Sequence, residues 1–208
     1  MSVHKLDHPL ISDRLAVLRD IRTPSLEFRA AVDQISGFLA YELASIFSTT
    51  EREVKTPLAV TRCTTIDRDR VVIVPILRAG LGLLPGVQRV FPTAPVLHLG
   101  IYRDEATLEP VCYYRKMSVD LKDKSVVLLD PMLATGGTII AAVEMMQKEA
   151  PANVSIVSLI ASRPGLDLVS GKFPDVEIFA GTVDPELDER GFIVPGLGDA
   201  GDRMFGTE

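Results

Sequence analysis

The sequence predicts an α/β fold, in which a mostly parallel sheet is flanked by helices. Short apolar runs recur at residues 71–77, 96–101, 126–129, 154–160 and 176–180. Because these runs are continuous rather than alternating, they indicate strands that are buried on both faces. Segments with helical spacing of apolar residues, at 80–90, 138–149 and 165–171, separate the runs and suggest βαβ units. At 208 residues, the chain is most simply one domain spanning positions 1–208.

The N-terminal part predicts one long helix before the first of these strands. Thr23-Pro24 has the pattern of a helix start, with proline at the first helical position. Apolar residues follow at roughly helical spacing, namely Leu26, Ala30, Val32, Ile35, Phe38, Leu39, Leu43 and Ile46. Residues 48–69 are polar and ambiguous, so we assign them no element.

Composition excludes several classes of function. The chain has 22 Lys+Arg against 28 Asp+Glu, a net charge of −6, which argues against nonspecific binding to nucleic acids or anionic membranes. Cys63 and Cys112 form no spaced framework, which suggests a reducing compartment and no structural zinc site. The N-terminus has no signal-peptide core, and the apolar runs are far shorter than the ~18 residues that span a bilayer. We therefore expect a cytoplasmic protein with no membrane partner.

The most informative segment is VVLLDPMLATGGT, from Val126 to Thr138. An apolar run stops at Asp130, and a loop then leads through Thr135-Gly136-Gly137-Thr138 into a helical pattern. Glycines allow close backbone approach to a phosphate, and a helix N-terminus offers unpaired N–H groups. The acid can accept hydrogen bonds from ribose hydroxyls. The segment favours a site for a phosphorylated sugar over the alternative of an ordinary strand, turn and capped helix.

Two arginines follow predicted strands in the same way. Arg78 precedes Ala79-Gly80, and Arg103 opens a stretch rich in charge, threonine, proline and tyrosine that runs to Lys116. Each could clamp a phosphate bidentately, or could simply face solvent. The stretch after Arg103 is either an exposed hairpin or a mobile lid that brings cations over a substrate.

The C-terminal tail is rich in glycine, which predicts a tightly folded loop with exposed backbone groups. Its turn residues are Gly191, Pro195, Gly196, Gly198, Gly201 and Gly206. Three of them fit G-x-G-x-x-G, but only seven residues follow Gly201, which leaves no room for the rest of a dinucleotide site. The chain has no P-loop motif, and its three histidines have no metal-ligand spacing.

Taken together, these segments resemble those of the type I phosphoribosyltransferases. VVLLDPMLATGGT is similar to the motif that binds phosphoribosyl diphosphate (PRPP), and VPILRAGLG, YRDEATLEPV and PGLGDAGDRMFGT resemble the uracil branch. The general motif has two adjacent acids, whereas Pro131 follows Asp130 here, a departure that the uracil branch shares. Two departures from that branch are Ser162-Arg163-Pro164-Gly165, where A-P-E-G is usual, and Phe192, where tyrosine is common.

The resemblance implies a type I phosphoribosyltransferase-like fold with a small hood formed from other parts of the chain. It implies transfer of the 5-phosphoribosyl group from PRPP to uracil in pyrimidine salvage, giving UMP and diphosphate, with Mg²⁺ as cofactor. Mg²⁺ would be held mainly through PRPP and waters, with no direct protein ligand. Further implied partners are a second copy of the chain, as a dimer or larger homo-oligomer, and GTP, an effector in some relatives.

The resemblance also implies the site residues. Arg78, Arg103, Asp130 and Asp199 form the catalytic set, with both arginines on the diphosphate and Asp130 on the ribose. The PRPP loop comprises Asp130, Pro131, Met132, Leu133, Ala134, Thr135, Gly136, Gly137 and Thr138. Uracil would be read by Ile193, Gly198, Asp199 and Ala200, largely through backbone groups. Asp199 would also face PRPP through the water shell of the metal.

Two alternatives stay open at this point. One is a pyrimidine-responsive regulator that binds nucleic acid on the same fold, although the net acidic chain lacks interleaved arginines and aromatics. The other is a phosphoribosyltransferase for another base, such as a purine.

Overall fold

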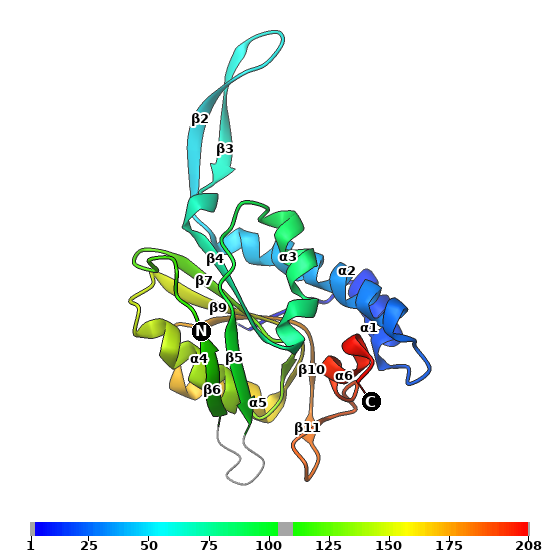
Figure 1. The fold of residues 1–208 in the computed structure, drawn as a ribbon. Coiled ribbons are helices and arrows are strands. Elements are labelled where there is room, and N and C mark those ends of the chain that lie inside the picture. The colour runs from blue at the N-terminus through cyan, green and yellow to red at the C-terminus, as the bar shows by residue number, and fades with distance from the viewer. Residues whose placement is uncertain (1–2, 104–109, 208) are drawn as a thin grey trace.

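The structure, a computed structural model, describes residues 3–103 and 110–207, and its centre is a mostly parallel sheet (Figure 1). The main strands lie in the spatial order β1 (Val3–Lys5), β10 (Glu177–Asp184), β9 (Asn153–Ser162), β7 (Ser125–Leu129), β4 (Val71–Leu77), β5 (Leu99–Arg103) and β6 (Pro110–Arg115). The short β8 (Met132–Leu133) also pairs with β9. All of these pairs are parallel except β5 with β6. The predicted fold class is therefore confirmed.

Helices cover both faces of this sheet (Figure 1). On one face lie α1 (Pro9–Arg19), α2 (Ser25–Leu43) and α3 (Leu84–Val90), and on the other lie α4 (Gly137–Gln147) and α5 (Arg163–Lys172). Successive side chains of β7 alternate between two cores: Val127 and Leu129 pack with α2, whereas Val126 and Leu128 pack with α4 and α5. Burial on both faces explains why β4 and residues 126–129 of β7 are continuously apolar.

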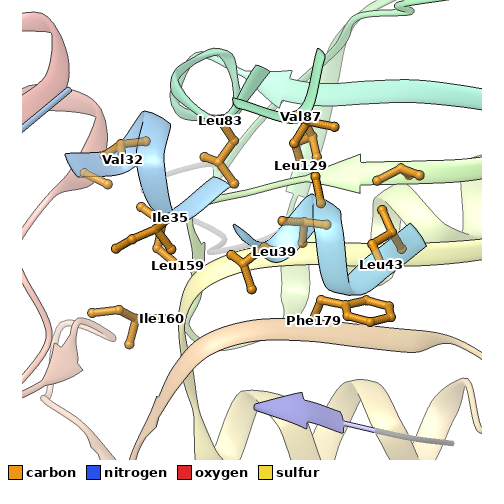
Figure 2. Close-up of a cluster of buried hydrophobic side chains, with 14 of the residues drawn as sticks. Val32, Ile35, Leu39, Leu43, Leu83, Val87, Leu129, Leu159, Ile160 and Phe179 are labelled. Carbon is orange, nitrogen blue, oxygen red and sulfur yellow. The ribbon is translucent and has the colours of Figure 1, made fainter. Parts of the chain in front are cut away.

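The helix α2 fills the centre of the first core (Figure 2). Its Ile35, Leu39 and Leu43 are fully buried at helical spacing. They pack with Leu83, Val87, Leu129, Leu159, Ile160 and Phe179 from the neighbouring elements. Truncating one such leucine to alanine costs ~2–5 kcal/mol. This core fixes the strands whose carboxyl ends carry the site.

Most predicted elements are present, with shifted ends. The apolar run 71–77 is β4, and the helical patterns 138–149 and 165–171 correspond to α4 and α5. The run 96–101 enters the sheet as a strand only at Leu99, with Val96 in an isolated bridge to Ile73. The long helix starts one residue later than predicted, because Pro24 is its N-cap. The helical pattern 80–90 divides into η3 (Ala79–Gly82) and α3.

Residues 48–69, which we left unassigned, form a hairpin that projects from the body (Figure 1). It consists of β2 (Thr49–Lys55) and β3 (Val60–Ile66), which pair antiparallel. The short η1 (Ala44–Ile46) and η2 (Arg68–Arg70) flank it. In β2 every residue is exposed except the half-buried Val54. A strand that buries neither face has no apolar period, which is why the sequence pattern did not predict it.

The C-terminal tail folds over the carboxyl ends of the strands as the predicted hood. It contains β11 (Glu186–Leu187), β12 (Ile193–Val194) and α6 (Ala200–Phe205). Met204 of α6 is fully buried in the core that α2 occupies. This chain end is therefore an integral part of the fold.

Within the described part of the chain, no helix combines the length and apolar character that crossing a membrane requires.

Candidate active site

A cavity of about 270 Å³ opens at the carboxyl edge of the sheet. Two distant segments supply all of its lining residues except Ala79 of η3: the start of the loop after β7, and the tail around β12. The lining residues are Ala79, Asp130, Pro131, Met132, Ala134, Arg190, Gly191, Phe192, Ile193, Gly198, Asp199, Ala200 and Gly201. Ligands of parallel α/β sheets bind in such a crevice, beyond the carboxyl ends of the strands.

Asp130 lies at the tip of β7 and is half-buried. Burial raises the pKa of its carboxyl from the ordinary 3.8 to about 7, and a hydrogen bond from the Met132 N–H partly opposes this rise. That bond is 3.3 Å long. The Asp130 carbonyl accepts a hydrogen bond of 2.7 Å from the buried Ser158 hydroxyl. The backbone of Asp130, which lines the cavity, is therefore held by β9.

The rest of the loop is also fastened to β9. Ser162 donates to the Ala134 carbonyl at 2.6 Å, and Met132 and Leu133 pair with β9 as β8. The Leu133 side chain is fully buried in the core of α4 and α5. Of the predicted PRPP residues, Leu133 can therefore reach a ligand only through its backbone.

The two glycines before α4 have different roles. Gly136 is the N-cap with φ of 85°, and an added Cβ would lie 3.1 Å from Val169 and 3.2 Å from the Gly165 carbonyl. A Cβ at Gly137 would meet nothing closer than the Thr135 hydroxyl at 3.9 Å. Gly136 is thus required by the turn, whereas Gly137 leaves an open approach to the N-terminus of α4. The first N–H groups of a helix lack partners within it and suit an anion.

The two predicted arginines lie differently with respect to the cavity. Arg78 follows β4, its side chain is 61% exposed, and its guanidinium is 3.5 Å from the Asp202 carboxylate. It does not line the cavity, although the next residue, Ala79, does. The Leu77–Arg78 peptide bond is cis. Arg103 ends β5, and its side chain lies outside the described part of the structure.

The stretch after Arg103 was predicted to be a hairpin or a lid. The described strands β5 and β6 form an antiparallel pair, as a hairpin requires. The connection, residues 104–109, lies outside the described residues, so the lid hypothesis stays a prediction.

All four residues that were predicted to read uracil line the cavity: Ile193, Gly198, Asp199 and Ala200. Ile193 and Ala200 are almost fully buried, so their backbone groups are held in place. Gly198 has φ of 80°, a conformation that favours glycine. The Asp199 carboxylate caps α6 by accepting a 2.9 Å hydrogen bond from the Asp202 N–H.

Sequence reasoning missed Arg190 as a lining residue. Its guanidinium stacks over the Phe192 ring, 4.9 Å from the centroid, and both residues border the cavity. The available signal was position: Arg190 directly precedes the glycine run that begins at Gly191. It adds a cation to the cavity lining that also contains Asp130 and Asp199.

The carboxylate oxygens of Asp130 and Asp199 are the kind of ligand that a hard cation such as Mg²⁺ prefers. Both residues line the cavity, but the described residues contain no cluster of three or more histidine, cysteine or acidic side chains placed to hold a metal. Mg²⁺ commonly keeps several waters and takes one or two carboxylates together with substrate phosphates. The residues present fit that mode of binding.

Comparison with known proteins gives consistent matches. The family model described as uracil phosphoribosyltransferase matches residues 5–207. A Clostridium beijerinckii protein named uracil phosphoribosyltransferase is 46% identical over 206 residues, covering 99% of each chain. A protein of the same name from Thermoanaerobacter pseudethanolicus is 44% identical over 207 residues, covering 100% of this chain and 99% of its own.

Solved structures agree with these matches. One of an Aquifex aeolicus protein superposes with a TM-score of 0.95 at 41% identity, covering 100% of this chain and 99% of that one. A hypoxanthine phosphoribosyltransferase from Staphylococcus aureus gives a TM-score of 0.51 at 14% identity, over 81% of this chain and 86% of that one. The second likeness concerns the fold alone.

Proposed function

The chain belongs to the uracil phosphoribosyltransferase family, and we propose that it transfers the 5-phosphoribosyl group of PRPP to uracil, giving UMP and diphosphate. The observation that carries this proposal is the shared cavity, which joins the loop that begins at Asp130 to the tail from Arg190 to Gly201. A transferase must hold two substrates against each other, and each segment suits one of them. Activity in pyrimidine salvage follows from the reaction.

The loop after β7 and the start of α4 hold the phosphoribosyl group in this proposal. The unpaired N–H groups at the start of α4, with the open backbone at Gly137, receive the 5-phosphate. The Asp130 carboxylate accepts hydrogen bonds from the ribose hydroxyls. Because Ser158 and Ser162 fasten this loop to β9, the sugar is bound by a preorganised backbone.

As diphosphate leaves, the sugar carbon passes through an oxocarbenium-like state and negative charge builds up on the diphosphate. This departing charge requires stabilisation. Arg78 lies beside the cavity at the end of β4, and in this proposal it and Arg103 neutralise the departing diphosphate. Guanidinium groups suit this task because they bind phosphate oxygens in two-pronged geometry. Such preorganised charges are a large part of catalysis in many enzymes.

The tail reads the base through its backbone. Ile193, Gly198, Asp199 and Ala200 line the cavity. In this proposal the backbone N–H and C=O groups of Ile193, Gly198 and Ala200 contact uracil, and Asp199 faces both the base and PRPP. Backbone groups that cannot rotate away fix both the orientation of uracil and the nitrogen that attacks the sugar.

Mg²⁺ is part of the proposal as the cation that accompanies PRPP. Asp199, and Asp130 when ionised, would hold its water shell. Bound there, Mg²⁺ would screen the charge of the diphosphate.

We further propose a cytoplasmic homo-oligomer with GTP as an effector. The free cysteines Cys63 and Cys112 suit a reducing compartment. The β2–β3 hairpin exposes Leu58 and Val60, and a two-stranded hairpin alone is marginally stable, which favours contact with a second copy. The effector is proposed from the family resemblance alone. Sedimentation velocity tests the oligomer, and rates with and without GTP test the effector.

One experiment tests the proposed reaction. The purified protein is incubated with PRPP, Mg²⁺ and each nucleobase in turn, and products are identified by chromatography and mass spectrometry. We expect UMP from uracil and no nucleotide from adenine, guanine or hypoxanthine. A purine nucleotide as main product would contradict the assigned base, and the absence of any nucleotide would contradict the transferase.

A further inference from the structure

An ion pair lies behind the tail and outside the cavity lining. The Arg19 guanidinium, at the end of α1, donates to both carboxylate oxygens of Asp184 at 2.8 and 2.6 Å. The Asp184 side chain, at the end of β10, is 5% exposed, and that of Arg19 is 27% exposed. The two residues are 165 positions apart in sequence. Neither lines the cavity.

The same pair binds both polar backbone groups of Gly196. Asp184 accepts a 2.9 Å hydrogen bond from the Gly196 N–H, and Arg19 donates one of 2.8 Å to the Gly196 carbonyl. One ion pair therefore fixes the position and the orientation of a single residue in the tail.

Gly196 connects the two stretches of tail that border the cavity. Residues 190–193 precede it and residues 198–201 follow it, and both stretches line the cavity. Gly196 has φ of 54°, and an added Cβ would lie 2.0 Å from the Ile193 carbonyl oxygen. Because Ile193 packs so closely on Gly196, a displacement of Gly196 shifts the Ile193 carbonyl.

We propose that Arg19 and Asp184 are positioning residues for base recognition: through Gly196 they set the backbone that contacts uracil. This inference rests on the proposed function and adds to it the means by which the reading groups are placed. Breaking the pair would leave the loop after β7 intact, because that loop is fastened to β9 by Ser158 and Ser162. The effect should therefore fall mainly on uracil, because the sugar and the 5-phosphate of PRPP are held by that loop and only Asp199 of the tail also faces PRPP.

Three variants separate this role from a general effect on folding. Asp184→Asn places an amide donor near the Arg19 and Gly196 donors. Arg19→Lys keeps a positive charge beside Asp184 but loses the forked geometry. Gly196→Ala alters the same residue without changing any charge. The matched control is Arg22→Ala, which removes a bidentate ion pair with Asp20. The Arg22 side chain is 86% exposed.

For each protein we would measure the PRPP dissociation constant by calorimetry, and KM for uracil and for PRPP by steady-state kinetics. We expect little change in the PRPP dissociation constant in any protein, and a loss of kcat/KM for uracil of about tenfold to a hundredfold in the three variants. The double variant Asp184→Asn with Arg19→Lys should lose less than the product of the single effects, since both act through Gly196. Arg22→Ala should behave as wild type.

Two results would overturn the inference. Unchanged KM and kcat/KM for uracil in variants that bind PRPP normally would show that Gly196 does not position the base. Parallel loss of PRPP and uracil binding would show a structural role. Failure of the wild-type protein to form UMP would instead contradict the proposed function on which the inference rests.

Discussion

The Ser162 hydroxyl donates a 2.6 Å hydrogen bond to the Ala134 carbonyl and accepts one of 2.9 Å from the Gly165 N–H. Ser162 is fully buried at the end of β9, so one side chain joins the loop after β7 to the first turn of α5. This position is one where the sequence departs from the uracil branch. The structure places this departure against the proposed PRPP loop, through the Ala134 carbonyl.

Ser162→Ala should lower stability and weaken PRPP binding. The substitution leaves the Ala134 carbonyl without this donor and removes the cap of α5, which together cost about 1–3 kcal/mol. We expect a lower Tm and a raised KM for PRPP, with little change in KM for uracil. Thermal unfolding and steady-state kinetics provide the measurements.

Ser155 is the matched control on the same strand. It is buried, and its hydroxyl has no hydrogen-bond partner among the described residues. Ser155→Ala should be neutral or stabilising, because it removes a buried group that is not satisfied. Equal effects of the two substitutions would mean that the Ser162 hydrogen bonds do not matter.

Activity should depend on the ionisation of Asp130. Burial raises its pKa to about 7, and only the ionised carboxyl is a pure acceptor for ribose hydroxyls. We expect kcat/KM of the wild-type protein for PRPP to fall as the pH drops through about 7. Asp130→Asn should have a lower kcat/KM at every pH and should lack this fall. The variant serves as the control for the titration of PRPP itself. If kcat/KM falls in the same way at low pH in both proteins, the fall is caused by titration of the substrate and not of Asp130.

The same group predicts how stability varies with pH. Because the folded-state pKa of Asp130 lies above 3.8, the folded chain binds this proton more tightly than the unfolded chain does. The contribution of Asp130 to the free energy of unfolding is therefore favourable at low pH, and it declines as the pH rises from about 4 to about 7. Asp130→Asn should gain stability relative to wild type across this interval. Denaturant titrations at pH 4 and pH 8 would measure the difference, and a constant difference would contradict the shifted pKa.

Arg78→Ala should impair turnover far more than folding. Loss of a charge at the leaving diphosphate corresponds to ~3 kcal/mol, or roughly a hundredfold in kcat/KM. The exposed contact of Arg78 with Asp202 adds little stability, so Tm should hardly change. Arg78→Lys should rescue activity only in part.

Arg89→Ala is the control for Arg78, since Arg89 is a similarly exposed arginine that pairs with Asp33 on α2. It should keep wild-type kinetics. The same substitution at Arg103 should resemble Arg78→Ala if both arginines serve the diphosphate. Near-normal kinetics of Arg78→Ala and Arg103→Ala would refute the assignment of these arginines to the diphosphate.

Gly137→Val should weaken PRPP binding without unfolding the chain. Its Cβ would enter open space beside the Thr135 hydroxyl, where the 5-phosphate is proposed to bind. Gly171→Val is the control. Like Gly137, Gly171 lies in a helix, and an added Cβ there would have nothing within 4 Å. Gly136→Val is less informative, since its φ of 85° strains any side chain. Calorimetry that finds equal PRPP affinity for Gly137→Val and wild type would place the phosphate elsewhere.

Sequence patterns predicted the elements whose burial leaves a regular apolar pattern in the local sequence. The strand β4 and residues 126–129 of β7 are apolar because both faces are buried, and Asp130 stands out as the acid that follows β7. The β2–β3 hairpin was not predictable in this way, since its exposed faces impose no period. The role of Arg19 was hidden for another reason: its partner Asp184 is 165 residues away, and only the folded chain brings them together.

The choice of base should follow from the fixed polarity of the backbone in the tail. An N–H can only donate and a C=O can only accept. Ile193, Gly198 and Ala200 line the cavity, and we propose that their backbone groups contact the base. Uracil offers an acceptor at O4 and a donor at N3, whereas cytosine offers the reverse pair. A site set for uracil would leave buried groups facing like partners in cytosine, which can reduce kcat/KM by ~10⁴ or more.

Competition kinetics with uracil, 5-fluorouracil and cytosine measure this preference on the wild-type protein. We expect 5-fluorouracil to be a substrate, because it retains O4 and the N3 donor, and cytosine to be rejected. Removing the tail is a poor test, since truncation at Gly196 would also remove Met204 from the core of α2. Comparable kcat/KM for cytosine and uracil would show that the backbone of the tail does not select the base.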